Sequence, residues 1–216
     1  LSSLEPWSLG PSLPDLWQDP RLQPQLHLPI QTGSDRLLKT MRRRGGSGAL
    51  RRLAAALRAR VPELALSTDL VAGLPGERGA DHRATLALVE ALGFCRLHVF
   101  PFSPRPGTPA ALMAEQVPVP LRRERAAELA ALGDRLAQAH RRSLAGRCLP
   151  VLWEAAGPDG DAQGRRRWGG LAPDGSRVHT WSAADLWNRI LPVYLPGPAG
   201  AAGAPPGMLI ADQSPA

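Results

Sequence analysis

Short apolar runs alternate with amphipathic helices over the first half of the chain, and this alternation constrains the fold more than any other feature. Residues 26–30, 64–71 and 96–100 are apolar runs typical of strands. Between them, residues 49–61 and 81–92 repeat leucine and valine at helical spacing. A strand, a helix and another strand within roughly 30 residues favour a parallel sheet with crossover helices.

The second half of the chain changes pattern twice. Residues 119–145 predict one long helix, because Pro120 stands where a first turn tolerates proline and leucines follow at helical spacing. Beyond Gly146, short strand candidates alternate with Gly, Pro and Asp turns, which is typical of a small β-barrel. These candidates are residues 148–155, 165–171, 177–181, 190–195 and 208–210. We therefore expect a sheet region at 1–118, a linking helix at 119–146 and a β domain at 147–216.

Charge and composition narrow the partners. The 216 residues carry a formal net charge of +7 and a pI near 11.0, which favours an anionic partner, nucleic acid first. No apolar stretch reaches the roughly 18 residues of a membrane helix, and no signal peptide opens the chain, so we expect a cytoplasmic protein. The first residue is leucine and begins a strand-like run at 1–4, so we also expect a piece of a longer protein.

Metal and nucleophile motifs are missing from the sequence. Cys95 and Cys148 are too few for a disulfide framework and too far apart for a metal knuckle. No Ser-His-Asp elbow or phosphate-binding loop is present. His27 and His98 lie inside apolar runs and are predicted to be core residues.

Polar segments follow the apolar runs, where parallel strands place functional groups. They are residues 2–6, 31–35, 69 with 73–77, and 102–108. Each one alone has a plainer interpretation: Ser34 or Asp35 suits a helix cap, and residues 73–77 suit a turn. Together they predict a binding site at one edge of the sheet.

Tryptophan and arginine stand together in the β domain. Trp168 follows arginines 165–167, and arginines beside an aromatic ring suit phosphate contacts and base stacking on RNA. The alternative, a tryptophan that fills a small core, stays open, and it is at least as strong for Trp153 and Trp181.

The strand-end segments, taken together and in order, closely resemble the radical SAM methylthiotransferases. The segments are residues 2–7, 26–35, 39–43, 68–77 and 98–108. They are most similar to the MtaB type, which converts threonylcarbamoyladenosine beside the tRNA anticodon to its 2-methylthio form. Ser-Ser-Leu-Glu-Pro at 2–6 and His-Val-Phe-Pro at 98–101 favour this type over the MiaB type, which acts on isopentenyladenosine, and the RimO type, which acts on a ribosomal protein aspartate. The resemblance is specific up to Arg125 and weak beyond Pro158.

The resemblance implies an α/β fold: a partial radical SAM (β/α) barrel, a long helix and a degenerate TRAM-like RNA-binding β-barrel. It implies S-adenosylmethionine and two 4Fe–4S clusters as cofactors of the parent family, and tRNA as partner. Neither cysteine fits the cluster motifs, so we expect a C-terminal portion that is inactive without the N-terminal half of the same protein. The alternatives are a non-catalytic RNA-binding remnant or a truncated gene product.

Carried over to this chain, the resemblance implies two groups of site residues and no catalytic or metal-binding residue. The expected cofactor contacts are Ser3, Glu5, Gln31, Ser34, Asp69, Phe100 and Phe102. The expected RNA contacts are Arg105, Arg122, Arg123, Arg165, Arg166 and Arg167.

Overall fold

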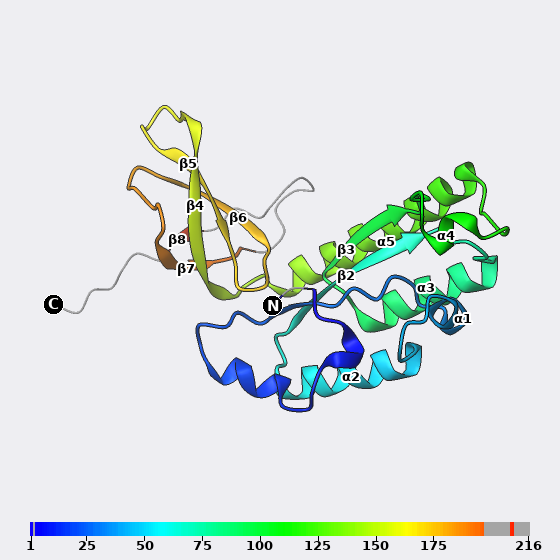
Figure 1. Cartoon of the computed structure of the whole chain (residues 1–216). Helices are drawn as coiled ribbons and strands as arrows, with labels where there is room; N and C mark the ends of the chain where they lie inside the picture. The colour runs from blue at the N-terminus through cyan, green and yellow to red at the C-terminus, as the bar shows by residue number, and fades with distance from the viewer. Residues whose placement is uncertain (2, 197–207, 210–216) are drawn as a thin grey trace. The chain divides into compact units, whose positions relative to one another are not determined.

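The computed structural model describes residues 1, 3–196, 208 and 209 (Figure 1). The chain divides into two compact units, Leu1–Gln138 and Ala139–Ala216. Each unit is described by itself below. No helix among the described residues combines the length and the hydropathy needed to cross a bilayer.

A parallel three-stranded sheet organises the first unit, as the sequence predicts. Its strands are β1 (Gln25–His27), β2 (Ala65–Ala72) and β3 (Arg96–Pro101), in the order β1-β2-β3. The helices are α1 (Asp35–Thr40), α2 (Ser47–Arg60), α3 (Gly79–Leu92), α4 (Pro109–Leu112) and α5 (Val119–Ser143). Helices α1 and α2 connect β1 to β2, and α3 connects β2 to β3. Strands and helices therefore alternate from β1 to β3, and the long helix α5 follows the last strand.

One face of the sheet is buried against these helices. Leu26 of β1 and Leu70 of β2 share a core with Leu57 of α2, Val89 of α3 and Leu129 of α5. Each helix contributes an apolar stripe at helical spacing, and burial of this area is the main stabilising term. The opposite face of the sheet takes no part in this core.

The segment before β1 departs from the prediction of a strand at residues 1–4. Leu1, Ser3 and Leu4 lie outside any strand, and the 3₁₀ helices η1 (Pro6–Ser8) and η2 (Leu13–Gln18) follow. The segment still runs beside β1, because the amide of His27 donates to the Leu1 carbonyl at 3.0 Å. Pro6 is the first residue of η1 and Pro14 the second residue of η2, positions where a helix tolerates proline.

The helix ends follow the local signals. Ser34 caps α1 by accepting from the amide of Leu37 at 3.3 Å, which decides between the two predicted caps. Gly93 ends α3 in the left-handed region, at φ 56°, as predicted. Pro120 lies in the first turn of α5.

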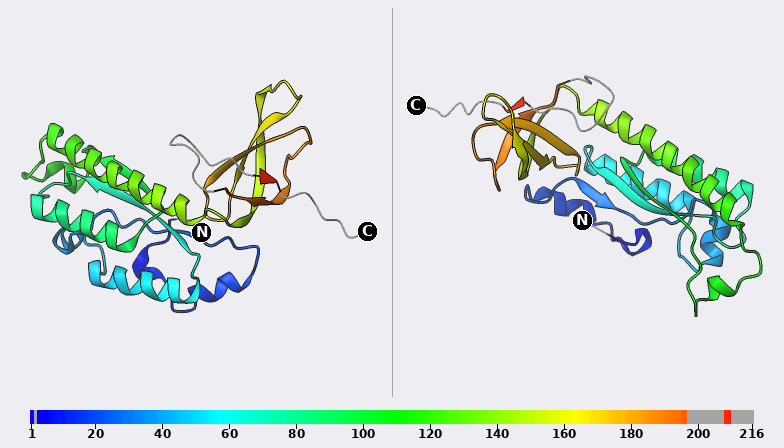
Figure 2. Two further views of the ribbon diagram at one scale, coloured as in Figure 1. Left: turned by 180° about the vertical axis from the view of Figure 1, so that it is seen from behind. Right: turned by 90° about the horizontal axis from the view of Figure 1, so that it is seen from above.

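An antiparallel sheet forms the second unit and curls into a half-barrel (Figure 2). Its order is β6-β5-β4-β7-β8, with β4 (Cys148–Gly160), β5 (Arg166–Leu171), β6 (Arg177–Ser182), β7 (Ile190–Tyr194) and β8 (Met208–Leu209). All five predicted strands are present. β4 runs past the predicted end at Ala155, and Ile210 lies outside the described residues. Trp153 and Val151 are fully buried in the core of this unit.

Candidate functional site

The face of the first sheet that points away from the core carries polar side chains. Residues that lie side by side in a parallel sheet point to the same face. The register pairs His27 with Ser67 and Asp69 with His98. Because Ser67 and Asp69 are two residues apart on β2, all four side chains share one face. We call these four residues the polar face.

The polar face is a connected cluster. Nδ1 of His27 lies 3.0 Å from Oγ of Ser67, and its Nε2 lies 3.4 Å from Oδ2 of Asp69. The rings of His27 and His98 meet edge to face with their centroids 5.9 Å apart. His27 is thus held on both nitrogens, whereas the Asp69 side chain is 33% exposed. Asp69 has free acceptor positions for a hydroxyl or amino group of a ligand.

The prediction that His27 and His98 belong to the core is wrong. His98 is exposed, and His27 lies on the polar face. On β3 the residues alternate, with Leu97 and Val99 partly buried in the core and the residues between them exposed. The alternation of Leu97 and Val99 with the residues between them could have indicated that His98 is exposed. It is hard to recognise because the run at 96–100 is mostly apolar.

The remaining predicted cofactor contacts lie at the ends of the strands. Gln31 adopts φ 68°, and its amide donates to the Asp69 carbonyl at 2.9 Å, so it is fixed next to the polar face. Phe100 of β3 is 53% exposed. Glu5 is exposed and accepts from Nε1 of Trp7 at 2.8 Å. Ser3 is exposed as well, at φ 58°.

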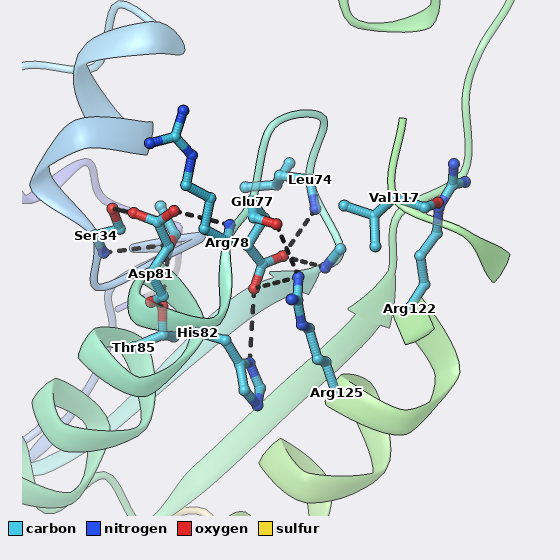
Figure 3. Close-up of polar contacts among 12 residues, drawn as sticks. Ser34, Leu74, Glu77, Arg78, Asp81, His82, Thr85, Val117, Arg122 and Arg125 are labelled. Carbon is cyan, nitrogen blue, oxygen red and sulfur yellow. Dashed lines mark hydrogen bonds and ion pairs between the residues drawn. The ribbon is translucent and has the colours of Figure 1, made fainter. Parts of the chain in front are cut away.

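Ser34 is buried instead of open to a ligand. Its hydroxyl donates to Oδ1 of Asp81 at 2.5 Å, which ties the start of α1 to α3 (Figure 3). Asp81 also accepts from the Arg36 guanidinium and from the Arg78 amide, the latter at 2.9 Å. Burial alone raises the pKa of Asp81, but these donors outweigh it and lower the pKa to about 2.

A second buried charge cluster fixes the loop at residues 73–77. Glu77 accepts from the amides of Gly73 and Leu74, the latter at 3.0 Å. Its other carboxylate oxygen lies 3.8 Å from Arg125 and 3.6 Å from Nδ1 of His82 (Figure 3). The loop is therefore rigid at the point where β2 ends. Nothing in the sequence alone pairs these three distant residues.

The pKa of His82 is raised in this cluster. Burial lowers its pKa, but the carboxylates of Glu77 and Glu128 outweigh burial, so the net pKa is raised. The Glu128 contact is short, with 2.6 Å between Nε2 and Oε2. The two carboxylates thus stabilise the protonated imidazole relative to the neutral one.

Arg122, a predicted RNA contact, points inward. Its guanidinium donates to the carbonyls of Val117 at 2.6 Å and Phe102 at 3.0 Å, and to Oε1 of Gln116 at 3.1 Å. The guanidinium also stacks on the Phe102 ring, 5.2 Å from its centroid. Arg122 therefore closes the loop after β3. The other two arginines predicted for this unit, 105 and 123, are exposed.

The exposed tryptophans of the second unit are Trp181 and Trp187, whereas Trp168, the one predicted to contact RNA, is buried. Trp168 is 3% exposed and packs in the core beneath Arg166, whose Cζ lies 5.6 Å from the ring centroid. Trp181 is 44% exposed and lies directly across from Arg167 in the β5–β6 pair. Arg165 is paired with Asp161 at 2.7 Å. Alternation along β5 and β6 puts Arg167 and Trp181 on the open face, a typical place for base stacking.

The chain's own residues do not fit an iron–sulfur cluster. Such clusters are held by thiolates, and Cys95 lies in the first unit while Cys148 lies in the second. Among the described residues, no three His, Cys, Asp or Glu side chains are placed to hold a metal ion. The polar face, by contrast, offers the Asp69 carboxylate as an acceptor, and the exposed ring of Phe100 follows two residues after His98 on β3.

Relatives of known function cover most of the chain. It is 43% identical to the tRNA-2-methylthio-N(6)-dimethylallyladenosine synthase of Clavibacter sepedonicus over 164 residues, 75% of this chain and 30% of the relative. It is 47% identical to the ribosomal protein uS12 methylthiotransferase RimO of an Anaeromyxobacter species over 137 residues, 63% of this chain and 29% of the relative. The chain is homologous to methylthiotransferases.

These methylthiotransferases are longer than the chain, which spans about a third of the length of the curated relatives it matches. No family model matches the sequence. Among solved structures, coproporphyrinogen III oxidase (HemN) from Escherichia coli, described as a radical SAM enzyme, is similar with a TM-score of 0.53. The similarity covers 79% of this chain and 45% of HemN at 15% identity, so it shows the fold alone.

Proposed function

We propose that the chain is the C-terminal part of a radical SAM methylthiotransferase that modifies an N6-substituted adenosine of tRNA in the cytoplasm. The observation that carries the proposal is the identity of 43% with the Clavibacter tRNA-2-methylthio-N(6)-dimethylallyladenosine synthase over 75% of the chain. The similarity to a radical SAM fold supports it. The thiolates for the clusters would come from outside these 216 residues.

The polar face is proposed to hold S-adenosylmethionine, which supplies the radical and methyl chemistry when bound. The Asp69 carboxylate would accept hydrogen bonds from ribose hydroxyls or the methionyl amino group. Gln31, Glu5 and Ser3 would contribute further polar contacts at the strand ends. The exposed ring of Phe100 and the backbone next to it, up to Phe102, would flank the adenine. Ser34 is left out, because its hydroxyl already donates to Asp81.

RNA is proposed to contact both units. In the first unit the exposed arginines 105 and 123 would bind phosphates, whereas Arg122 holds a loop. In the second unit, Trp181 would stack on a base. Arginines 165–167 would contact the backbone around that base. Residues 147–216 of this unit are proposed to form a TRAM-like β domain, which follows a linking helix at 119–146.

The most specific part of the proposal is which nucleoside is modified. The motifs at residues 2–6 and 98–101 favour threonylcarbamoyladenosine, and we keep that as the prediction. The tRNA-modifying relative reported above is named for dimethylallyladenosine. One experiment therefore distinguishes the two nucleosides.

The experiment is deletion of the gene, followed by mass spectrometry of the tRNA nucleosides. We expect the 2-methylthio derivative of threonylcarbamoyladenosine to disappear and its unthiolated precursor to accumulate. Accumulation of dimethylallyladenosine instead would correct the nucleoside and keep the function. Loss of methylthiolation on ribosomal protein uS12, with unchanged tRNA, would overturn the tRNA substrate. No change in either would contradict methylthio transfer altogether.

A non-catalytic RNA-binding protein is the second candidate. The observation that favours it is the poor fit to a cluster, with one cysteine in each unit. This candidate predicts that deletion leaves all methylthio groups in place while the purified chain still binds RNA.

A further inference from the structure

A recess lies at the loop that joins α1 to α2, beside η1. It is lined by Glu5, Trp7, Met41, Arg42, Arg43 and Arg44, and we call it the arginine recess. The arrowheads of β2 and β3 point toward the side on which α1 lies (Figure 1). In a β/α fold the segment between a strand and the helix that returns antiparallel to it lies at the functional edge. The arginine recess therefore borders the same edge as the polar face.

Three residues make the fixed floor of the recess. Arg43 donates to the Pro29 carbonyl at 3.3 Å, and its guanidinium lies 5.3 Å from the centroid of the Trp7 ring. Glu5 lies 4.0 Å from the same guanidinium and accepts from Nε1 of Trp7 at 2.8 Å. One carboxylate and one arginine thus balance each other beside a half-buried indole.

The positive charges of Arg42 and Arg44 are not neutralised by a neighbouring carboxylate in this way. Both side chains are exposed, and neither makes a hydrogen bond or ion pair with any residue that the structure describes. Three guanidinium groups and a single carboxylate line the recess, so its potential is positive.

The backbone at Arg42 adds an independent observation. Arg42 adopts φ 54° directly after α1, where its amide donates to Lys39 at 3.0 Å and that of Arg43 to Leu38 at 2.9 Å. This is the helix ending in which the left-handed position is usually glycine. Arginine is unfavourable there for the local fold, and glycine would suit the backbone better.

We propose that the arginine recess binds the phosphodiester backbone of the RNA substrate at the rim of the cofactor site. Paired guanidinium groups match phosphate oxygens, and the recess volume of about 540 Å³ has room for a nucleotide. The neighbouring Trp7 gives the flanking base an apolar surface. This inference rests on the proposed function in that it takes RNA to be the substrate.

The test measures binding of an anticodon stem-loop RNA to the full chain by fluorescence anisotropy over a salt series. Arg42→Gly and Arg44→Ala are each expected to weaken binding about five- to eightfold near 0.1 M salt and to lower the salt slope by about 0.7–0.9. Arg42→Gly suits its backbone position, so lost binding is not explained by unfolding. Arg135→Ala on α5 removes an exposed charge about 24 Å along the helix from its start, and should change binding less than about twofold.

Two further ligands separate the alternatives. S-adenosylhomocysteine should bind the variants as it binds the wild-type chain, and a loss there would assign the recess to the cofactor. A peptide from ribosomal protein uS12 should bind no differently, and a loss confined to it would assign the recess to a protein substrate. Wild-type RNA affinity in both arginine variants would overturn the proposal.

Failure of the proposal and failure of the proposed function are distinct outcomes. If deletion of the gene removes the methylthio nucleoside but both arginine variants bind RNA normally, only the recess assignment fails. If the variants lose RNA affinity but deletion leaves every methylthio group in place, the recess assignment holds and the chemistry fails.

Discussion

Asp81 links the stability of the first unit to pH. Its pKa of about 2 in the folded chain lies below the ordinary value of 3.8. A lowered carboxyl pKa stabilises the fold above pH 4, and the contribution disappears as pH falls from about 4 toward 2. We expect about 2 kcal/mol of unfolding free energy to be lost over that range. Urea titrations at a series of pH values check this, and Asp81→Asn should flatten the profile.

Arg42 offers the opposite test at a single residue, because a substitution should stabilise the chain. Replacing a non-glycine residue in the left-handed region by glycine relieves roughly 1 kcal/mol of backbone strain. Arg42→Gly should therefore unfold at a higher urea concentration than the wild-type chain. A loss of stability in this variant would mean that the Arg42 side chain supports the fold, contrary to its lack of described partners.

At the level of elements, Gly33 determines how closely the loop after β1 approaches α3. A Cβ on Gly33 would lie 2.7 Å from Cα of Thr85 and 2.9 Å from the carbonyl oxygen of Ala84. Because both contacts are backbone atoms, Gly33→Ala should destabilise the first unit by about 1–3 kcal/mol. Gly48→Ala, on the first turn of α2 with an arginine side chain 3.6 Å away, is the matched control and should not destabilise it.

The elements themselves were largely predictable from the sequence. Hydrophobic periodicity predicts the strands and the helices α2, α3 and α5, because each buries one face or stripe. The segment at residues 1–4 is an exception: the sequence favours a strand, whereas Leu1, Ser3 and Leu4 run beside β1 without belonging to a strand. The sequence also favours Trp168 over Trp181 as the tryptophan that contacts RNA, and the structure reverses their exposure. Strand alternation, not proximity to arginines in the sequence, decides that Trp168 is buried and Trp181 exposed.

The candidate site was predictable only in part. The motif order singles out Asp69 as a strand-end residue, whereas the structure has it inside β2, three residues before the strand ends, with its side chain on the polar face. The placement of His27 and His98 beside it depends on the register between strands, which a single sequence does not contain. The same holds for the clusters around Asp81 and Glu77, which join residues tens of positions apart.

For the whole molecule, RNA affinity should depend on Trp181, the exposed tryptophan of the second unit that lies across from Arg167 in the β5–β6 pair. Trp181→Ala should weaken binding of an anticodon stem-loop RNA by about 1–3 kcal/mol, the usual value for one stacked base. The melting temperature should change little, since the side chain is 44% exposed. Tyr194→Ala on β7, at 39% exposure, is the matched control. Equal losses in the two variants would contradict a specific role for Trp181.

The most direct test of the account concerns the polar face in the protein as the cell makes it. The gene with Asp69→Asn is returned to the deletion strain, and the 2-methylthio nucleoside of tRNA is measured by mass spectrometry, with Arg135→Ala as control. The account predicts that the Asp69 variant accumulates to the normal protein level yet fails to restore the nucleoside, whereas the control restores it. Full restoration by Asp69→Asn would contradict the claim that this face of the sheet holds the cofactor.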